Sequence, residues 1–194
     1  NVPSKVRIAY AEQGKSNALH WSDSTQTKNV NNNTATLTLN AVEPGKKYNY
    51  RIELDDELTD TQNTFNTPAN YYDRTPPPDL RIAVGGAHYV TEEGFEPPYQ
   101  ILGGGYGIFS TILNEKPELM IWAGNTAHLR NSDWNTQSGT LRRFGKARSV
   151  PELQPLLASI AHYGTWSDND YGTPGAGKFY SHRRHAEQSF QAYW

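Results

Sequence analysis

The stretch TPPPDLRIAVGGAH, residues 75–88, marks the point at which the sequence pattern changes. Three consecutive prolines fix an extended backbone and lack the amide hydrogens that a helix or a central strand needs. The short apolar run Leu80–Val84 follows and ends at Gly85 and Gly86, which is typical of a strand that leads into a loop. We therefore predict an N-terminal domain over residues 1–67, a linker over 68–79 and a second domain over 80–194.

Upstream of the prolines, apolar and polar residues alternate with a period of two. This pattern is typical of half-buried strands in an antiparallel sheet. The predicted strands are Val6–Tyr10, Thr34–Leu39 and Tyr48–Ile52, with a further strand that ends near Phe65. We expect a β-sandwich of the fibronectin or immunoglobulin kind. A full sandwich needs about seven strands and about 100 residues, so we expect its first strands to be missing here.

Downstream of the prolines, apolar runs alternate with segments of helical spacing. Strands are expected at Leu119–Trp122 and His162–Trp166, and helices at Tyr106–Glu115 and Ala186–Trp194. Ser149 and Glu152 have the spacing of a capping box ahead of another helix, although Pro155 leaves open a start at Gln154 instead. Alternating strands and helices favour an α/β sheet. Because three strands are few for an independent α/β core, we expect this domain to be incomplete as well.

Composition excludes several classes of function. The 194 residues include 18 basic and 20 acidic side chains, so the chain lacks the basic excess that nucleic-acid binding requires. No run approaches the roughly 18 apolar residues of a membrane-spanning helix. The absence of cysteine excludes disulfide bonds and cysteine-ligated zinc. A cysteine-free chain rich in Asn, Thr and Tyr favours an exported protein that is secreted, periplasmic or at the cell surface. The oligomeric state stays open.

Polar side chains follow each of the three predicted strands of the second domain. The loops that carry them are Gly85–His88, Gly124–His128 and Ser167–Asp170. In open α/β sheets, ligands bind outside the carboxyl ends of the strands, so we expect the three loops to contribute to one site. Their His, Asn and Asp side chains suit a metal or phosphate centre. The alternative is that they are turn residues that cap strands.

Several longer stretches carry a resemblance to a known family. They are VEPGKKYNY (residues 42–50), FNTP (65–68), PELMIW (117–122), PELQPLLAS (151–159) and HYGTW (162–166). Together they resemble the PhoD-like alkaline phosphatase/phosphodiesterase family, in which a sandwich domain precedes a metallophosphoesterase domain. The resemblance implies a β-sandwich followed by the first half of an α/β metallophosphoesterase domain. It also implies a phosphoester substrate and bound metal ions, which would be calcium, iron or zinc.

The departures from the family pattern fall on its site positions. The family reads Gly-Ser-Cys after the first strand, Gly-Asp-Asn-x-Tyr after the second and Trp-Asp-Asp-His-Asp after the third. This sequence has Ala87 in place of the thiolate ligand, Asn125 in place of the bridging carboxylate and Asn169 in place of the active-site His. Only Asp168 remains at a position where the family has a metal ligand. A two-metal site needs anionic bridges between its cations, so we predict phosphoester hydrolysis at or near background.

Other residues have two interpretations each. His88 and His128 are candidate substitute metal ligands, because imidazole binds transition metals, but a lone loop His is more often a surface residue. The planar guanidinium of Arg130 can donate two hydrogen bonds to a phosphate. The alternative is that Arg130 forms a surface salt bridge. The basic runs Arg142-Arg143 and His182–His185 are interpreted as solvated faces, and Gly103–Gly105 as a flexible loop without the Lys of a P-loop. Two functions stay open: a metal-dependent phosphoester hydrolase, and a non-catalytic relative that acts as a binding or structural module.

Overall fold

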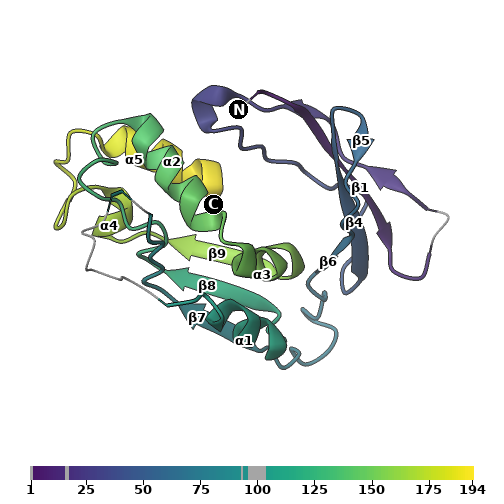
Figure 1. Ribbon diagram of the computed structural model, residues 1–194. Coiled ribbons are helices and arrows are strands. Elements are labelled where there is room, and N and C mark those ends of the chain that lie inside the picture. The colour runs from purple at the N-terminus through teal and green to yellow at the C-terminus, as the bar shows by residue number, and fades with distance from the viewer. Residues whose placement is uncertain (1, 16–17, 93, 96–103) are drawn as a thin grey trace.

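The computed structural model describes residues 2–15, 18–92, 94–95 and 104–194 (Figure 1). The predicted loop Gly103–Gly105 therefore lies partly outside the described residues. Two sheets form, one on each side of the proline segment. The first contains β1 (Lys5–Glu12), β2 (His20–Trp21), β3 (Thr25–Gln26), β4 (Lys47–Leu54), β5 (Glu57–Leu58) and β6 (Asn63–Asn66). The second contains β7 (Ile82–Gly85), β8 (Leu119–Ala123) and β9 (Ala161–Thr165).

The first sheet is antiparallel and is built around the pair β1 and β4. Their register places Ile8 opposite Ile52 and Tyr10 opposite Tyr50, which confirms the two predicted strands. Burial does not alternate strictly along them, because Ala9 and Glu53 are 4% and 5% exposed. The rings of Tyr48 and Phe65 stack across β4 and β6 with centroids 5.1 Å apart. The described part of residues 1–67 forms one sheet rather than two packed sheets, so the expected sandwich is not confirmed.

The predicted strand Thr34–Leu39 is wrong. Leu37 and Leu39 are more buried than Thr36 and Thr38, as the alternation suggested, but the segment is not a strand. It follows a short 3-10 helix, η1 (Asn29–Asn31), and no described residue pairs with it in a ladder. Hydroxyl groups hold the chain beyond it instead. The Tyr10 hydroxyl accepts a hydrogen bond from the Ala41 N–H at 3.1 Å, and the Tyr48 hydroxyl accepts one from the Glu43 N–H at 2.8 Å.

The second sheet is parallel, with the strand order β7-β8-β9. The helices are α1 (Ile108–Asn114), α2 (Gln137–Arg148), α3 (Gln154–Ser159), α4 (Asp168–Tyr171) and α5 (Arg183–Tyr193), together with the 3-10 turn η2 (Pro151–Leu153). The predicted strands and the first and last helices are confirmed. The capping box at Ser149 is wrong, because Ser149 ends α2 and its hydroxyl donates to the carbonyl of Lys146 at 2.9 Å. The next helix starts at Gln154, the second of the two predicted starts.

The helices cover one face of the parallel sheet. Met120 and Trp122 of β8 are 2% and 4% exposed, and they pack with Phe109 of α1, Phe144 of α2 and Leu156 of α3 in one hydrophobic core. The alternate residues of the strands point to the other face, which is open in this chain. There Val84, Ile121 and Tyr163 are neighbours in register and are 66%, 37% and 60% exposed. The carboxyl ends of β7–β9 point away from the antiparallel sheet (Figure 1).

The two sheets are connected by residues 67–81, all of which are described and none of which lies in a helix or strand. Direct hydrogen bonds also join the two parts. The Tyr50 hydroxyl donates to the carbonyl of Ala158 at 3.1 Å, and the Asn32 side-chain amide donates to the Tyr193 hydroxyl at 2.6 Å. The antiparallel sheet therefore packs on the amino-terminal side of the parallel sheet, and the opposite edge stays free to form a site.

Candidate functional site

The three loops after β7, β8 and β9 meet at one edge, as predicted. The Ala87 N–H donates to the carbonyl of Gly124 at 3.2 Å, and the His88 N–H donates to the carbonyl of Asn125 at 2.9 Å. The Leu129 N–H donates to the carbonyl of Asn169 at 2.7 Å. These backbone hydrogen bonds link the first loop to the second and the second loop to the third.

Glycine permits this close approach of the loops. A Cβ atom on Gly124, which has a φ of +93°, would lie 3.0 Å from the Ser167 Cβ. A Cβ on Gly86 would lie 3.0 Å from the carbonyl oxygen of Gly124. Non-glycine residues beside them also adopt the left-handed conformation, with φ values of 58° at Ala87, 53° at Asn125 and 51° at His128. Left-handed L-residues are strained by about 1–2 kcal/mol each, and such strain is concentrated at functional sites.

Asn125, Ser167 and Asn169 form a hydrogen-bonded group that we call the polar cluster. The Asn125 Oδ1 accepts hydrogen bonds from the Ser167 hydroxyl at 2.5 Å and from the Asn169 side-chain amide at 3.0 Å. The Ser167 hydroxyl in turn accepts from the Asn125 N–H at 3.1 Å. The three side chains carry no charge, and the one oxygen of Asn125 that would face a cation is already used by two donors.

Buried Asp170 holds the second and third loops in place. Its side chain is 0% exposed. Its Oδ1 accepts from the Ala127 N–H at 2.7 Å, and its Oδ2 accepts from the Ser167 N–H at 3.2 Å. Ser167 and Asp170 also form the capping box of α4. The sequence reading missed this role, although the Ser-x-x-Asp spacing at 167–170 was the signal that could have revealed it.

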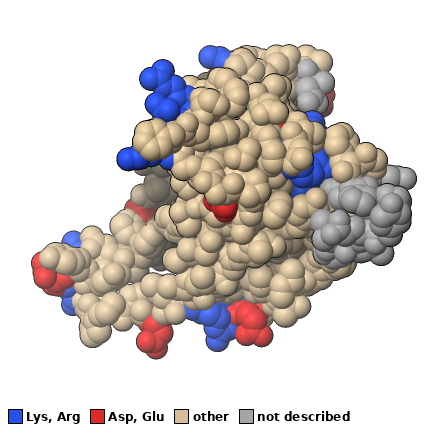
Figure 2. Space-filling model, turned by 90° about the vertical axis from the view of Figure 1, so that its left-hand side faces the viewer, with Lys and Arg blue, Asp and Glu red and all other residues tan. Residues whose placement is uncertain are grey.

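Asp168 lies outside the polar cluster. Its Oδ2 accepts from the Gly175 N–H at 2.9 Å, and its Oδ1 accepts from the Asn169 N–H at 3.1 Å. The hydrogen bond from Gly175 is the main reason that the pKa of this exposed carboxyl lies below its usual value. Figure 2, which faces this edge of the sheet, shows a largely uncharged surface with one acidic side chain near its middle, and with charged side chains of both signs towards the rim.

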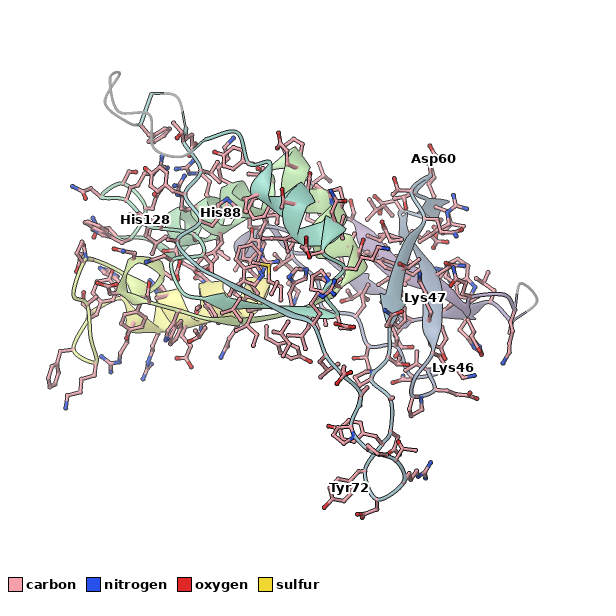
Figure 3. The ribbon with its side chains drawn as sticks, turned by 90° about the horizontal axis from the view of Figure 1, so that it is seen from below. Lys46, Lys47, Asp60, Tyr72, His88 and His128 are labelled. Atoms are coloured by element: carbon pink, nitrogen blue, oxygen red, sulfur yellow. The ribbon has the colours of Figure 1, made fainter. Side chains whose placement is uncertain are left out.

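His88 and His128 lie close to each other at the same edge (Figure 3). His88 is 8% exposed, and its ring lies 5.1 Å from Phe109 and 6.1 Å from Trp122, measured between centroids. Burial, with a smaller contribution from Arg143, lowers the pKa of His88 to about 4. Burial also lowers the pKa of His128. Both imidazoles are therefore neutral at neutral pH, and the His88 Nε2 has no hydrogen-bond partner among the described residues.

Arg130 is part of an ion network rather than free at the site. Its Nε donates to Asp133 at 2.8 Å and its Nη2 donates to Glu92 at 2.9 Å. Arg142 bridges the same two carboxylates, with 2.9 Å to Asp133 and 2.5 Å to Glu92. Burial opposes ionisation of Glu92, but the hydrogen bonds from Arg142 and Arg130 outweigh it, so that the pKa of Glu92 is lowered. Of the two interpretations of Arg130, the salt bridge is the one that these contacts support.

The solvated-face interpretation of Arg142-Arg143 is wrong for Arg143. This side chain is 0% exposed, and its guanidinium donates to the carbonyls of Ala127 at 3.0 Å and Val90 at 2.8 Å. Arg143 is therefore a structural support beneath the second loop. The run His182–His185 does lie mostly exposed at the start of α5, as expected.

The residues at the edge do not fit a two-metal centre. No group of three or more His, Asp and Glu side chains within the described ranges is placed to hold a metal ion. The polar cluster offers amide and hydroxyl oxygens where two cations need shared anionic ligands. Asp168 supplies one carboxylate, and both of its oxygens accept backbone hydrogen bonds.

A pocket of about 710 Å³ opens beside the polar cluster. Gly85–Tyr89 form one part of it, and His128 belongs to its lining, so the pocket is continuous with the first and second loops. Tyr106, Phe109 and Trp122 supply aromatic walls. We call this space the aromatic pocket. It lies within the volume range of about 300–1,000 Å³ that is usual for small-molecule sites.

The fold of this chain is similar to those of two solved structures. The chain is similar to the structure of PhoD, with a TM-score of 0.72 and 18% identity over 99% of this chain and 39% of that chain. It is also similar to the purple acid phosphatase PPD1 from yellow lupin (Lupinus luteus) seeds, with a TM-score of 0.60 and 11% identity over 98% of this chain and 35% of the other. No model of a protein family matches the sequence, and the search of curated proteins finds no match. The resemblance to PhoD-like phosphoesterases is thus confirmed at the level of the fold.

The chain spans well under half the length of either phosphatase. The similarity therefore concerns a part of each of those proteins, and it is a similarity of fold.

Proposed function

We propose that this chain carries the scaffold of a phosphoester hydrolase of the PhoD type, and that its own hydrolysis of phosphoesters is at or near background. The polar cluster is the observation that supports this proposal. Asn125 and Asn169 stand where the family resemblance implies a bridging carboxylate and the active-site His, and they hydrogen-bond to each other at 3.0 Å.

The chemistry of the cluster explains the low activity. A pair of calcium, iron or zinc ions is held by anionic bridges that offset the repulsion between the cations. The neutral amide of Asn125 does not provide such a bridge, and an amide at Asn169 does not transfer a proton as a His does. The described residues can still position a phosphoester next to Ser167 and Asn169 through hydrogen bonds, but the polar cluster contains no carboxylate or imidazole that would move a proton there, and the Ser167 hydroxyl is committed to Asn125.

Restoration of the family residues tests the proposal. The unmodified chain, Asn125→Asp, Asn169→His and the double variant are assayed on an aryl phosphate monoester and a diester, with calcium, iron or zinc added. Asn66→Asp, at an exposed position of β6, is the control for the change of charge. We expect background rates for the unmodified chain and the control. Strong metal-dependent turnover by the unmodified chain would overturn the proposal and would point to His88 or His128 as substitute ligands.

A second candidate function is a non-catalytic binding module. The observation that favours it is the aromatic pocket, whose lining includes His88 with an Nε2 that has no hydrogen-bond partner among the described residues. Both functions predict little bound metal, so binding of a ligand is what supports the module. Bound metal near stoichiometry in the purified chain would indicate an active hydrolase and would contradict both.

The remaining assignments are also proposals. We propose that residues 1–67 and 80–194 are separate domains joined by 68–79, and that the protein is exported to the periplasm, the cell surface or the medium. Within the described residues, no helix is both long and apolar enough to cross a membrane.

A further inference from the structure

We propose that the aromatic pocket binds an aromatic ring, and that this ring is the organic group of the ester whose phosphoryl group lies at the polar cluster. The second half of this statement rests on the proposed function, whereas the first half does not. The first observation is where the pocket lies relative to the second loop. Ala87 and His88, which line the pocket, are hydrogen-bonded through their backbone to Gly124 and Asn125 of the second loop. A ligand with two ends can therefore reach both regions.

The charge of the lining selects an uncharged occupant. The described residues that line the pocket include no Asp, Glu, Lys or Arg. A phosphate or carboxylate placed inside this pocket would lose its hydration without gaining a counter-charge, which is strongly unfavourable. The phosphoryl end of a ligand therefore stays outside, at the hydroxyl and amide groups of the edge.

The shape and chemistry of the walls favour a ring over a flexible chain. The ring of His88 lies 6.0 Å from that of Tyr106 and 5.1 Å from that of Phe109, measured between centroids, and both pairs are tilted. Aromatic groups at this spacing attract one another, so the pocket presents a continuous aromatic wall to a ring. Glycines line the pocket as well, and a Cβ on Gly104 or Gly105 would meet no atom within 4 Å. Among the described residues, no side chain therefore stands between a flat group and the glycine side of the pocket.

His88 belongs to the aromatic wall and is not a polar anchor. Its Nε2 has no hydrogen-bond partner in the described part of the chain, but the atom is buried and does not reach the open space. The ring of His88 packs against Phe109 and Trp122, so it contributes an aromatic surface to the pocket.

The test is equilibrium binding to the unmodified chain with EDTA present, so that neither metal nor hydrolysis is involved. Ligand-detected NMR titrations compare phenol, toluene, cyclohexanol, 1-octanol, phenyl phosphate and inorganic phosphate. We expect phenol and phenyl phosphate to bind and to compete with each other, and inorganic phosphate to bind at least tenfold more weakly. Equal binding of phenol and cyclohexanol, or tighter binding of octanol, would overturn the preference for a ring. Binding of inorganic phosphate alone would overturn the pocket proposal altogether.

Substitutions at and away from the aromatic pocket test whether phenol binds there. Tyr106 is half-buried at the pocket, and Tyr106→Ala is expected to weaken phenol binding about threefold to tenfold, the effect of losing one aromatic pair. Tyr72→Ala is the matched control, because Tyr72 is 78% exposed and lies far from the pocket (Figure 3). His88→Phe keeps an aromatic ring in the wall, so it should retain binding of both phenol and toluene. Unchanged phenol affinity in Tyr106→Ala contradicts the proposal. If a variant does not fold, the probe series on the unmodified chain still decides.

The two proposals fail in different ways. Metal-dependent hydrolysis by the unmodified chain would remove the proposed function but would leave the EDTA binding result intact. Absence of phenol binding would remove the aromatic pocket as a ligand site and would leave the hydrolase assays unaffected.

Discussion

The polar cluster and the aromatic pocket lie side by side at the carboxyl edge of one parallel sheet, yet they differ in what they offer a ligand. In the polar cluster, the Asn125 Oδ1 is occupied by donors from Ser167 and Asn169. In the aromatic pocket, the rings of His88, Tyr106 and Phe109 line an open space. Polar side chains that follow a strand are therefore not always free to bind a ligand. Here the residues of the polar cluster, which stand at positions expected for a metal site, hydrogen-bond to one another. The space that is open to a ligand is the neighbouring aromatic pocket.

The largest expected effect comes from removing the charge that supports the polar cluster. Asp170→Asn keeps the shape of the side chain but weakens its hydrogen bonds to the N–H groups of Ala127 and Ser167. Hydrogen bonds to a charged group contribute about 1.5–3 kcal/mol each, so we expect the free energy of unfolding in urea to fall by about 3 kcal/mol.

Asp168→Asn is the matched control for this change, two residues away on the same short helix. Asp168 is exposed, and among the described residues its side chain bonds to the backbone N–H groups of Asn169 and Gly175, so its replacement should alter stability by less than about 1 kcal/mol. Equal losses in the two variants would mean that Asp170 does not hold the second and third loops together.

A smaller effect is expected within the polar cluster itself. Asn125→Ala removes the hydrogen bonds to Ser167 and Asn169 and leaves a Cβ residue at a φ of 53°. Asn125→Gly removes the same hydrogen bonds but relieves the left-handed backbone. We expect Asn125→Ala to lower the free energy of unfolding by about 2 kcal/mol, and Asn125→Gly by about 1 kcal/mol less than that.

The same pair of variants separates the cluster from the aromatic pocket. Both should leave phenol binding within about twofold of the unmodified chain, since Asn125 does not line the pocket. A large loss of phenol affinity in Asn125→Gly would show that the two regions act as one site.

The smallest expected effect is on how stability depends on pH, and it involves His162, which is hydrogen-bonded to Trp122 in the wall of the aromatic pocket. The His162 Nδ1 accepts a hydrogen bond from the Trp122 indole at 3.0 Å, so its Nε2 carries the proton and donates to the Leu156 carbonyl at 3.1 Å. Burial lowers the pKa of His162, the hydrogen bond to Leu156 opposes this, and nearby Arg148 adds to the lowering.

The sign of the pH effect follows from this lowered pKa. The unfolded chain binds the proton more tightly, with a pKa near 6.5, so the stability from neutral His162 is complete above that value and is lost as the pH falls below it. His88 and His128 act in the same direction. Urea unfolding of the unmodified chain and of His162→Asn between pH 7 and pH 5 isolates His162. The variant should lose less stability on acidification, and parallel curves would contradict the assignment.

The spacing of apolar residues along the chain was enough to predict the strands in which these residues also pack into the core. The alternation in Val6–Tyr10 and Tyr48–Ile52 and the apolar runs at Leu80, Leu119 and His162 all led to the observed sheets. Thr34–Leu39 shows the limit, because a strand also needs a partner with free backbone groups, and a pattern of single residues does not reveal one. Helix α2 was missed because Arg142 and Arg143 interrupt its apolar face. The partners of Arg143 are carbonyl groups 16 and 53 residues away, which no local pattern records.

The candidate site was predictable in its position but not in its bonding. The rule that ligands gather at the carboxyl ends of parallel strands placed the three loops together. The mutual hydrogen bonds of Asn125, Ser167 and Asn169 depend on glycine contacts and left-handed backbone that the sequence does not specify. The aromatic pocket combines residues of β7, α1 and β8 with loop residues between them, and of these the sequence indicated only the loop residues His88 and His128 as candidate ligands.

The central claim is that the polar cluster replaces a metal centre with neutral hydrogen bonds. Calorimetric titration of the unmodified chain with zinc, beside the double variant Asn125→Asp and Asn169→His, tests this most directly. The account predicts that the unmodified chain binds zinc at least a hundredfold more weakly than the double variant, because the restored side chains supply an anion and an imidazole in place of two amides. Tight binding of two zinc ions by the unmodified chain would contradict the account.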